Sequence, residues 1–227
     1  MASRIVAPRS SKRFVGRSDI LNNIAHTIAR IESNGSQILA ISGPAGIGKS
    51  RLIREIVRRF EDRYDNPPCL FAESFENDRG VPYAPVIDLL RKELNGAHEE
   101  RIRSTMAHLN ADLSSIMPEL DSGEHSTGAH AELSREHLQY LISQLLSSCL
   151  LGQPSLLIVE DLHWCDDLTL ELLERLSRDL RESSALIIIS FRDDEIQPAL
   201  QQLLVHLNRE RRLIDVQVGP LDRGDVA

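Results

Sequence analysis

Eight residues, Gly43 to Ser50, have the types and the spacing of a phosphate-binding loop. They read GPAGIGKS and match the pattern GxxxxGK[ST]. Glycines let backbone N–H groups turn inward and approach a phosphate chain closely, and the start of the following helix adds its positive dipole end. In this pattern Lys49 places a positive charge at the β- and γ-phosphates, and the Ser50 hydroxyl ligates Mg²⁺. The predicted nucleotide contacts are Gly43, Pro44, Ala45, Gly46, Ile47, Gly48, Lys49, Ser50 and Arg51.

The segments on either side of the octet test whether it is only a chance glycine turn. An apolar run of strand type, residues 37–42, comes directly before it. An amphipathic helix is predicted directly after it, over residues 50–63, with apolar side chains at helical spacing. A strand, a glycine loop and a helix in this order favour a phosphate-binding loop over a chance turn.

A second group that could do chemistry stands at the end of another apolar run. Residues 154–161 predict a buried strand that ends in Glu160 and Asp161. In a parallel sheet these carboxylates would face the same crevice as the glycine loop. Glu160 is expected on the Mg²⁺ side, directly or through a water, and Asp161 is expected to orient the attacking water. The alternative is an ordinary polar strand end.

A third strand, predicted over residues 185–191, is followed by Arg192. A cation at this strand end is expected to contact the γ-phosphate, which makes Arg192 a candidate catalytic residue beside Lys49 and Asp161. The alternative is a surface arginine that pairs with Asp193 or Asp194.

The remaining chain predicts the elements that must position these groups. Apolar strands alternate with amphipathic helices, which indicates an α/β fold, a three-layer P-loop sandwich with a mostly parallel sheet. In the first helix Ser18 or Asp19 is the predicted cap, and Gly35 the predicted end. The other expected helices cover residues 84–94, 99–109, 132–151, 166–183 and 196–210, the helix at 166 capped by Asp166 or Asp167, and the other strands cover residues 69–75 and 212–218.

Composition excludes several other classes. The 227 residues carry a net charge of −8, which argues against direct nucleic-acid binding because phosphate contacts need Lys and Arg. The chain shows neither a signal peptide nor an apolar run long enough to span a membrane. The three cysteines lie far apart in the sequence, which fits a reducing cytoplasm. The histidines do not have the spacing of metal ligands, so no metal cluster is expected. His163 and Trp164 are expected to pack the turn after the acidic strand, with a water-positioning His163 as the alternative.

Five segments together resemble the AAA-like ATPase domain of STAND proteins, which are signal-transduction ATPases with numerous domains. Similar modules occur in large LuxR-type transcriptional regulators and in certain adenylate cyclases and serine/threonine kinases. The acidic segment is the most specific of the five, since many NTPases share the glycine loop. The segments, in chain order, are FVGR at 14–17, GPAGIGKS at 43–50, PYAP at 82–85, LLIVEDLHWCD at 156–166 and SFRDDE at 190–195.

The resemblance implies a sheet order of 2-3-4-1-5 in this chain's own strand numbering. It also implies that Val15, Gly16 and Arg17 lie against the adenine, where the alternative is a simple turn into the first helix. Two residues depart from the family's pattern: Cys165 stands where relatives often have alanine, and Glu160 replaces a common aspartate.

The expected organisation is a flexible basic tail at 1–13 and an ATPase core at 14–227, with a helical and loop insertion at 76–135. Relatives continue into a lid, a winged helix, repeats and an output domain, which this sequence is expected to lack.

These expectations favour a nucleotide-switch module that uses ATP/ADP and Mg²⁺ and acts as a weak Mg²⁺-dependent ATPase. The family implies self-association through the ATPase domain. Two alternatives stay open at this point. One is a P-loop small-molecule kinase, and the other is a non-catalytic interaction module that only holds nucleotide.

Overall fold

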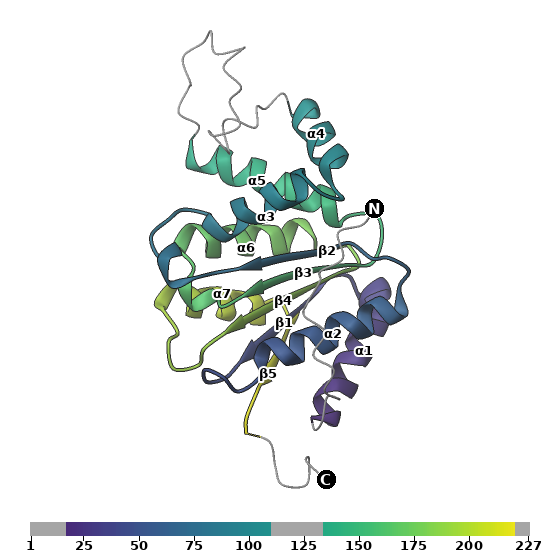
Figure 1. Cartoon of the computed structure of the whole chain (residues 1–227), viewed down its shortest axis with the longest axis vertical. Coiled ribbons are helices and arrows are strands. Elements are labelled where there is room, and N and C mark those ends of the chain that lie inside the picture. Colours follow the sequence, from purple (N-terminus) through teal and green to yellow (C-terminus); the bar gives the residue numbers. More distant parts are fainter. Residues whose placement is uncertain (1–16, 110–133, 221–227) are drawn as a thin grey trace.

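A computed structural model describes residues 17–109 and 134–220 of the chain (Figure 1). Its centre is one sheet of five strands in the order β2-β3-β4-β1-β5, and every neighbouring pair is parallel. The predicted α/β architecture and the predicted strand order are therefore confirmed. The strands are β1 (Gln37–Ser42), β2 (Cys69–Glu73), β3 (Ser155–Glu160), β4 (Ala185–Phe191) and β5 (Leu213–Gln217).

The central strands are apolar throughout because both faces of the sheet are covered. All six residues of β3 and all seven of β4 are buried. Alternate residues serve opposite faces: Ile187 and Ile189 belong to one hydrophobic cluster, and Leu186 and Ile188 belong to the other. This two-sided burial is the physical reason why these strands read as continuous apolar runs.

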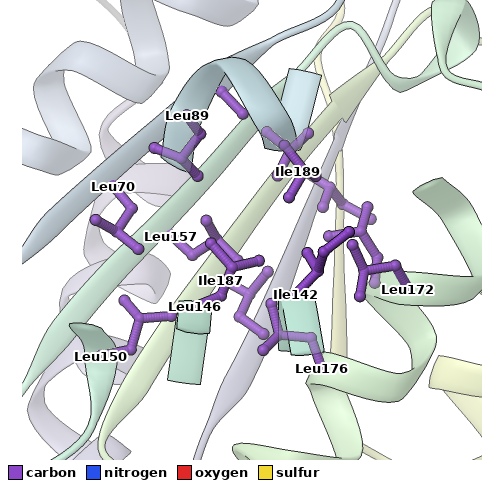
Figure 2. Close-up of a cluster of buried hydrophobic side chains, with 14 of the residues drawn as sticks. Leu70, Leu89, Ile142, Leu146, Leu150, Leu157, Leu172, Leu176, Ile187 and Ile189 are labelled. Atoms are coloured by element: carbon purple, nitrogen blue, oxygen red, sulfur yellow. The ribbon is translucent and has the colours of Figure 1, made fainter. Parts of the chain in front are cut away.

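Two layers of helices cover the sheet (Figure 1). Helices α1 (Ser18–Asn34) and α2 (Lys49–Arg63) pack on one face. The opposite face carries the larger cluster, and Figure 2 shows leucines and isoleucines of helices and strands that contribute to it. The helices whose buried residues join this cluster are α3 (Ala84–Leu94), α4 (Glu99–His108), α5 (Arg135–Leu150), α6 (Asp167–Asp179) and α7 (Pro198–Arg209).

Several predicted boundaries are wrong, among them the end of α6, which is Asp179 rather than residue 183. Neither Ser18 nor Asp19 caps α1, because the helix already begins at Ser18 and the left-handed residue Arg17 precedes it. Strand β2 ends at Glu73 rather than at residue 75. Its continuation turns at Phe75, whose backbone N–H donates to the Asp78 carboxylate at 2.7 Å, and enters the short 3-10 helix η1 (Glu76–Asp78).

Other predicted ends are confirmed. Asp166 caps α6, since its carboxylate accepts from the N–H groups of Leu168 and Thr169, and Gly35 ends α1. The predicted tail at 1–13 lies outside the described residues, as does much of the predicted insertion. Within the described ranges, no helix is both long and apolar enough to cross a membrane.

Candidate functional site

The predicted phosphate loop connects the end of β1 to the start of α2. Gly43 and Gly48 both have positive φ, 149° and 103°. A Cβ at Gly43 would lie 2.6 Å from the Val218 carbonyl oxygen, so no other residue fits there without displacing the chain after β5. Gly48 directly precedes α2, whose first-turn N–H groups and positive dipole end therefore face the loop.

Lys49 is the first residue of α2, and its side chain folds back along the loop. Its Nζ donates to the carbonyl oxygens of Gly43 at 2.8 Å and Pro44 at 3.1 Å. Burial lowers the pKa of Lys49, and Arg192 adds to that effect, while Asp161 opposes it. The ammonium therefore sits inside the curve of the loop, close enough to both strand ends to sense their charges.

Ser50 and Glu160 join the loop to the acidic strand end. The Ser50 hydroxyl donates to Glu160 Oε2 at 2.5 Å, and Glu160 is only 5% exposed. Burial raises the pKa of the Glu160 carboxyl, the Ser50 hydrogen bond opposes that rise, and the neighbouring Asp161 adds to it. A buried carboxylate of this kind gains stability from a nearby cation.

Asp161 follows β3 in the left-handed region, with φ 59° and ψ 47°. Aspartate tolerates this region better than most residues. The Asp161 N–H donates to Ser190 Oγ on β4 at 3.2 Å, and its carboxylate is about one-third exposed. The turn therefore places a partly hydrated carboxylate one residue beyond the buried Glu160.

Arg192 follows β4 beside the loop, because Phe191 pairs with Ser42 in the sheet. Its Nη1 donates to Glu195 Oε1 at 2.5 Å, and its guanidinium carbon lies 5.7 Å from the centre of the Trp164 ring. The alternative prediction paired Arg192 with Asp193 or Asp194. This is wrong, because the partner is Glu195.

Two further predicted features lie around this edge. Arg17 Nη2 donates to the Ile47 carbonyl of the loop at 2.9 Å and to the Gly219 carbonyl at 3.1 Å. Val15 and Gly16 lie outside the described residues. His163 is 0% exposed and packs against Trp164 in a tilted arrangement with ring centroids 4.9 Å apart, which agrees with its predicted packing role.

A family model described as an AAA ATPase domain matches residues 13–189. The chain belongs to this AAA ATPase family. The matched range includes the glycine loop, the acidic end of β3 and most of β4. Nucleotide binding, typically with Mg²⁺, is the family's common property, and its members often form oligomers.

Individual relatives are distant. An uncharacterized protein of Rhizobium meliloti (strain 1021) is 24% identical over 192 residues, which cover 79% of this chain and 18% of that protein. The ORC1 protein of Aeropyrum pernix, solved in complex with DNA, has a TM-score of 0.51 at 15% identity and covers 96% of this chain and 49% of its own. PCH-2 of C. elegans has a TM-score of 0.44 at 14% identity, covering 92% and 45%. At 15% identity the likeness to the ORC1 structure shows the fold alone.

The residues of this AAA ATPase domain fit Mg²⁺ as it is usually held beside phosphates. Magnesium takes oxygen ligands, retains several waters and needs only one or two protein groups. The chain offers such a pair in the Ser50 hydroxyl and the Glu160 carboxylate. Among the described residues there is no cluster of three His, Cys, Asp or Glu side chains that would hold a metal by itself.

Sequence reasoning missed several residues that build this edge of the AAA domain. Ser190 accepts the Asp161 N–H, and the Asp166 carboxylate accepts the Tyr83 N–H at 3.1 Å. The second contact ties the PYAP segment to the acidic segment, although 83 residues separate them. Both were quoted as motifs, but only the fold shows that they touch. Glu195 stands within the quoted SFRDDE segment, yet its pairing depends on a turn that no residue spacing reveals.

Proposed function

We propose that this AAA ATPase domain is a nucleotide switch that binds ATP with Mg²⁺ and hydrolyses it slowly. The observation that carries the proposal is the hydrogen bond between Ser50 and Glu160, 2.5 Å long. It brings the last residue of the glycine loop and the acid of strand β3 together as a pair of oxygen ligands. Bound there, Mg²⁺ would neutralise phosphate charge.

The surrounding residues supply the other functions of such a site. Backbone N–H groups of the loop and the start of α2 bind the phosphates, and Lys49 exchanges its loop carbonyls for phosphate oxygens. Asp161 accepts a hydrogen bond from the water that attacks the γ-phosphorus. As the new P–O bond forms, the bond to the bridging oxygen breaks, ADP leaves with the electron pair, and the proton of the water passes to the released phosphate. Arg192 contacts the γ-phosphate, and Val15, Gly16 and Arg17 contact the adenine side.

We further propose that the switch belongs to a STAND-type signalling or transcriptional regulator. The ordered set of motifs supports this class. The chain also spans only 18% of the length of its Rhizobium relative and 49% of the ORC1 chain, so a domain of this kind occurs within larger proteins. ATP binding would then control self-association, and regulatory domains elsewhere in a longer protein would read it. The contribution of such regulatory domains to the function is therefore also proposed.

A titration with a fluorescent ATP analogue, with and without Mg²⁺, followed by a phosphate-release assay, tests the proposal. Lys49→Ala should weaken binding by about 100-fold, because a buried charge that meets phosphate is lost. Lys92→Ala, which removes an exposed lysine of α3, is the matched control and should bind like the wild type.

The outcomes separate the possible functions. Binding that depends on Lys49, with slow phosphate release, supports the switch. Binding without release even at high protein concentration favours a module that only holds nucleotide. Transfer of phosphate to an added small acceptor favours a kinase. Equal binding by wild type and Lys49→Ala would contradict all three.

A further inference from the structure

Four side chains meet beyond the ends of three neighbouring strands, and the proposed function assigns a role to only one of them. Arg79 follows η1, Trp164 follows β3, and Arg192 and Glu195 follow β4. The guanidinium carbons of Arg79 and Arg192 lie 4.3 Å and 5.7 Å from the centre of the Trp164 ring. One indole thus contacts two cations that come from segments more than 100 residues apart.

Glu195 is shared unequally between these two arginines. Its Oε1 accepts from Arg192 Nη1 at 2.5 Å, while its Oε2 lies 3.9 Å from Arg79 Nη2. A turn holds the near pair, since the Glu195 N–H donates to the Arg192 carbonyl at 3.4 Å. The carboxylate therefore has a close partner and a second cation within a small movement.

Arg192 lies beside the glycine loop, so its pairing with the Glu195 carboxylate affects how it can meet a phosphate. Phe191 pairs with Ser42, so Arg192 and Gly43 are the first residues beyond two adjacent strands. A guanidinium at this place lies beside the loop that is proposed to hold the phosphates. It binds phosphate best through a fork of two N–H groups, and a carboxylate competes for that fork. Arg192 already gives its Nη1 group to Glu195, so a phosphate that binds this side of the guanidinium competes with the carboxylate.

We propose that Glu195 determines how strongly the site distinguishes a nucleoside triphosphate from a diphosphate. The terminal phosphate of the triphosphate competes with the Glu195 carboxylate for Arg192, and Arg79 receives the carboxylate when Arg192 leaves. A diphosphate lacks the competing group, so the Arg192–Glu195 pair persists. The inference rests on the proposed nucleotide binding and adds to it the pair of residues that sets the preference.

The test compares the affinities of a non-hydrolysable ATP analogue and of ADP for three variants. Glu195→Gln frees Arg192, so the preference for the triphosphate should rise roughly threefold to fivefold, the range of a partly exposed ion pair. Arg79→Gln removes the alternative partner, so the preference should fall. Asp194→Asn removes the same charge one residue away and should leave the preference unchanged.

Trp164 is the single tryptophan of the chain and reports the exchange directly. Its emission should change when the triphosphate analogue binds and should change much less with ADP, because only the triphosphate draws Arg192 off the ring. A packing role for Glu195 would not produce this difference between nucleotides.

The outcomes distinguish this inference from the function on which it rests. If the wild type binds neither nucleotide, the proposed function fails. If it binds both, the inference is overturned in either of two cases. One is a Glu195→Gln preference equal to that of the wild type, and the other is an emission change equal for the two nucleotides.

Discussion

The glycine loop lies between an acidic flank, Glu160 and Asp161 at the end of β3, and a basic flank, Arg192 after β4. The two flanks differ in whether their charged groups are hydrogen-bonded to the loop. On the acidic flank, Glu160 is hydrogen-bonded to Ser50 of the loop itself. On the basic flank, Arg192 lies beside the loop but is paired with Glu195 and stacked on Trp164. One flank is assembled before any ligand arrives, and the other is engaged in contacts of its own.

The difference follows from where each side chain is attached. Glu160 is the last residue of a buried strand, so the sheet fixes its backbone and burial leaves its side chain few rotamers. Arg192 lies outside its strand on a long side chain whose position depends on its partners. If the proposed function holds, the acidic flank would set where a metal and phosphate are held, and the basic flank would respond to which nucleotide is present.

The largest effect should come from Asp161→Asn, which tests whether the acidic flank acts in catalysis. We expect phosphate release to fall about 100-fold, because the amide is a poor acceptor for the attacking water. ATP affinity should fall far less, since Asp161 is not expected to touch the nucleotide or the metal. Single-turnover phosphate release and binding titrations measure the two quantities separately.

Asp215→Asn is the matched control, because Asp215 is an exposed aspartate of β5. It should change neither quantity. Equal losses of affinity and turnover in Asp161→Asn would show that this carboxylate contributes to binding, and the acidic flank would then have no separate catalytic part.

A smaller effect is expected from Glu160→Gln, which tests whether the acidic flank is the metal side. The Mg²⁺ concentration that supports half-maximal ATP binding should rise by about tenfold, as for other residues that support a metal site. Nucleotide binding without Mg²⁺ should change little. The measurement is a Mg²⁺ titration at fixed fluorescent ATP, with Glu195→Gln as the control from the basic flank. An equal shift of the Mg²⁺ midpoint in both variants would remove the distinction between the flanks.

The acidic flank could also be predicted further from the sequence than the basic one. The apolar runs located β1, β3 and β4, and the strand order followed from the family resemblance. These facts alone bring Glu160 to the glycine loop, because backbone geometry does the positioning. The sequence named Arg192 as well, but not its partner. Glu195 reaches Arg192 through a turn, and Arg79 arrives from a distant loop, so both contacts depend on tertiary structure.

The sequence predicted that His163 packs in the turn after β3, but it could not show the polar surroundings of the ring, which lead to the smallest expected effect. Within the described part of the chain neither ring nitrogen has a hydrogen-bond partner, and Nδ1 lies 3.9 Å from Asp161 Oδ1. Burial lowers the pKa of His163 and Arg192 adds to that, although Asp161 opposes it. The folded chain therefore keeps this imidazole neutral at a pH where the unfolded chain, with a pKa of about 6.5, takes up a proton.

A group of this kind makes the folded state less stable as the pH falls through the pKa of the unfolded chain. Between pH 7.5 and pH 5.5, His163 should cost up to about 1 kcal/mol in the free energy of unfolding. His163→Phe should remove that part of the pH dependence and keep the ring packed on Trp164. Urea denaturation at the two pH values measures it, with the exposed His26→Gln as control. If wild type and His163→Phe lose equal stability, the histidine is protonated in the folded chain. The acidic flank would then contain a charged pair, His163 with Asp161, comparable to the pair on the basic flank.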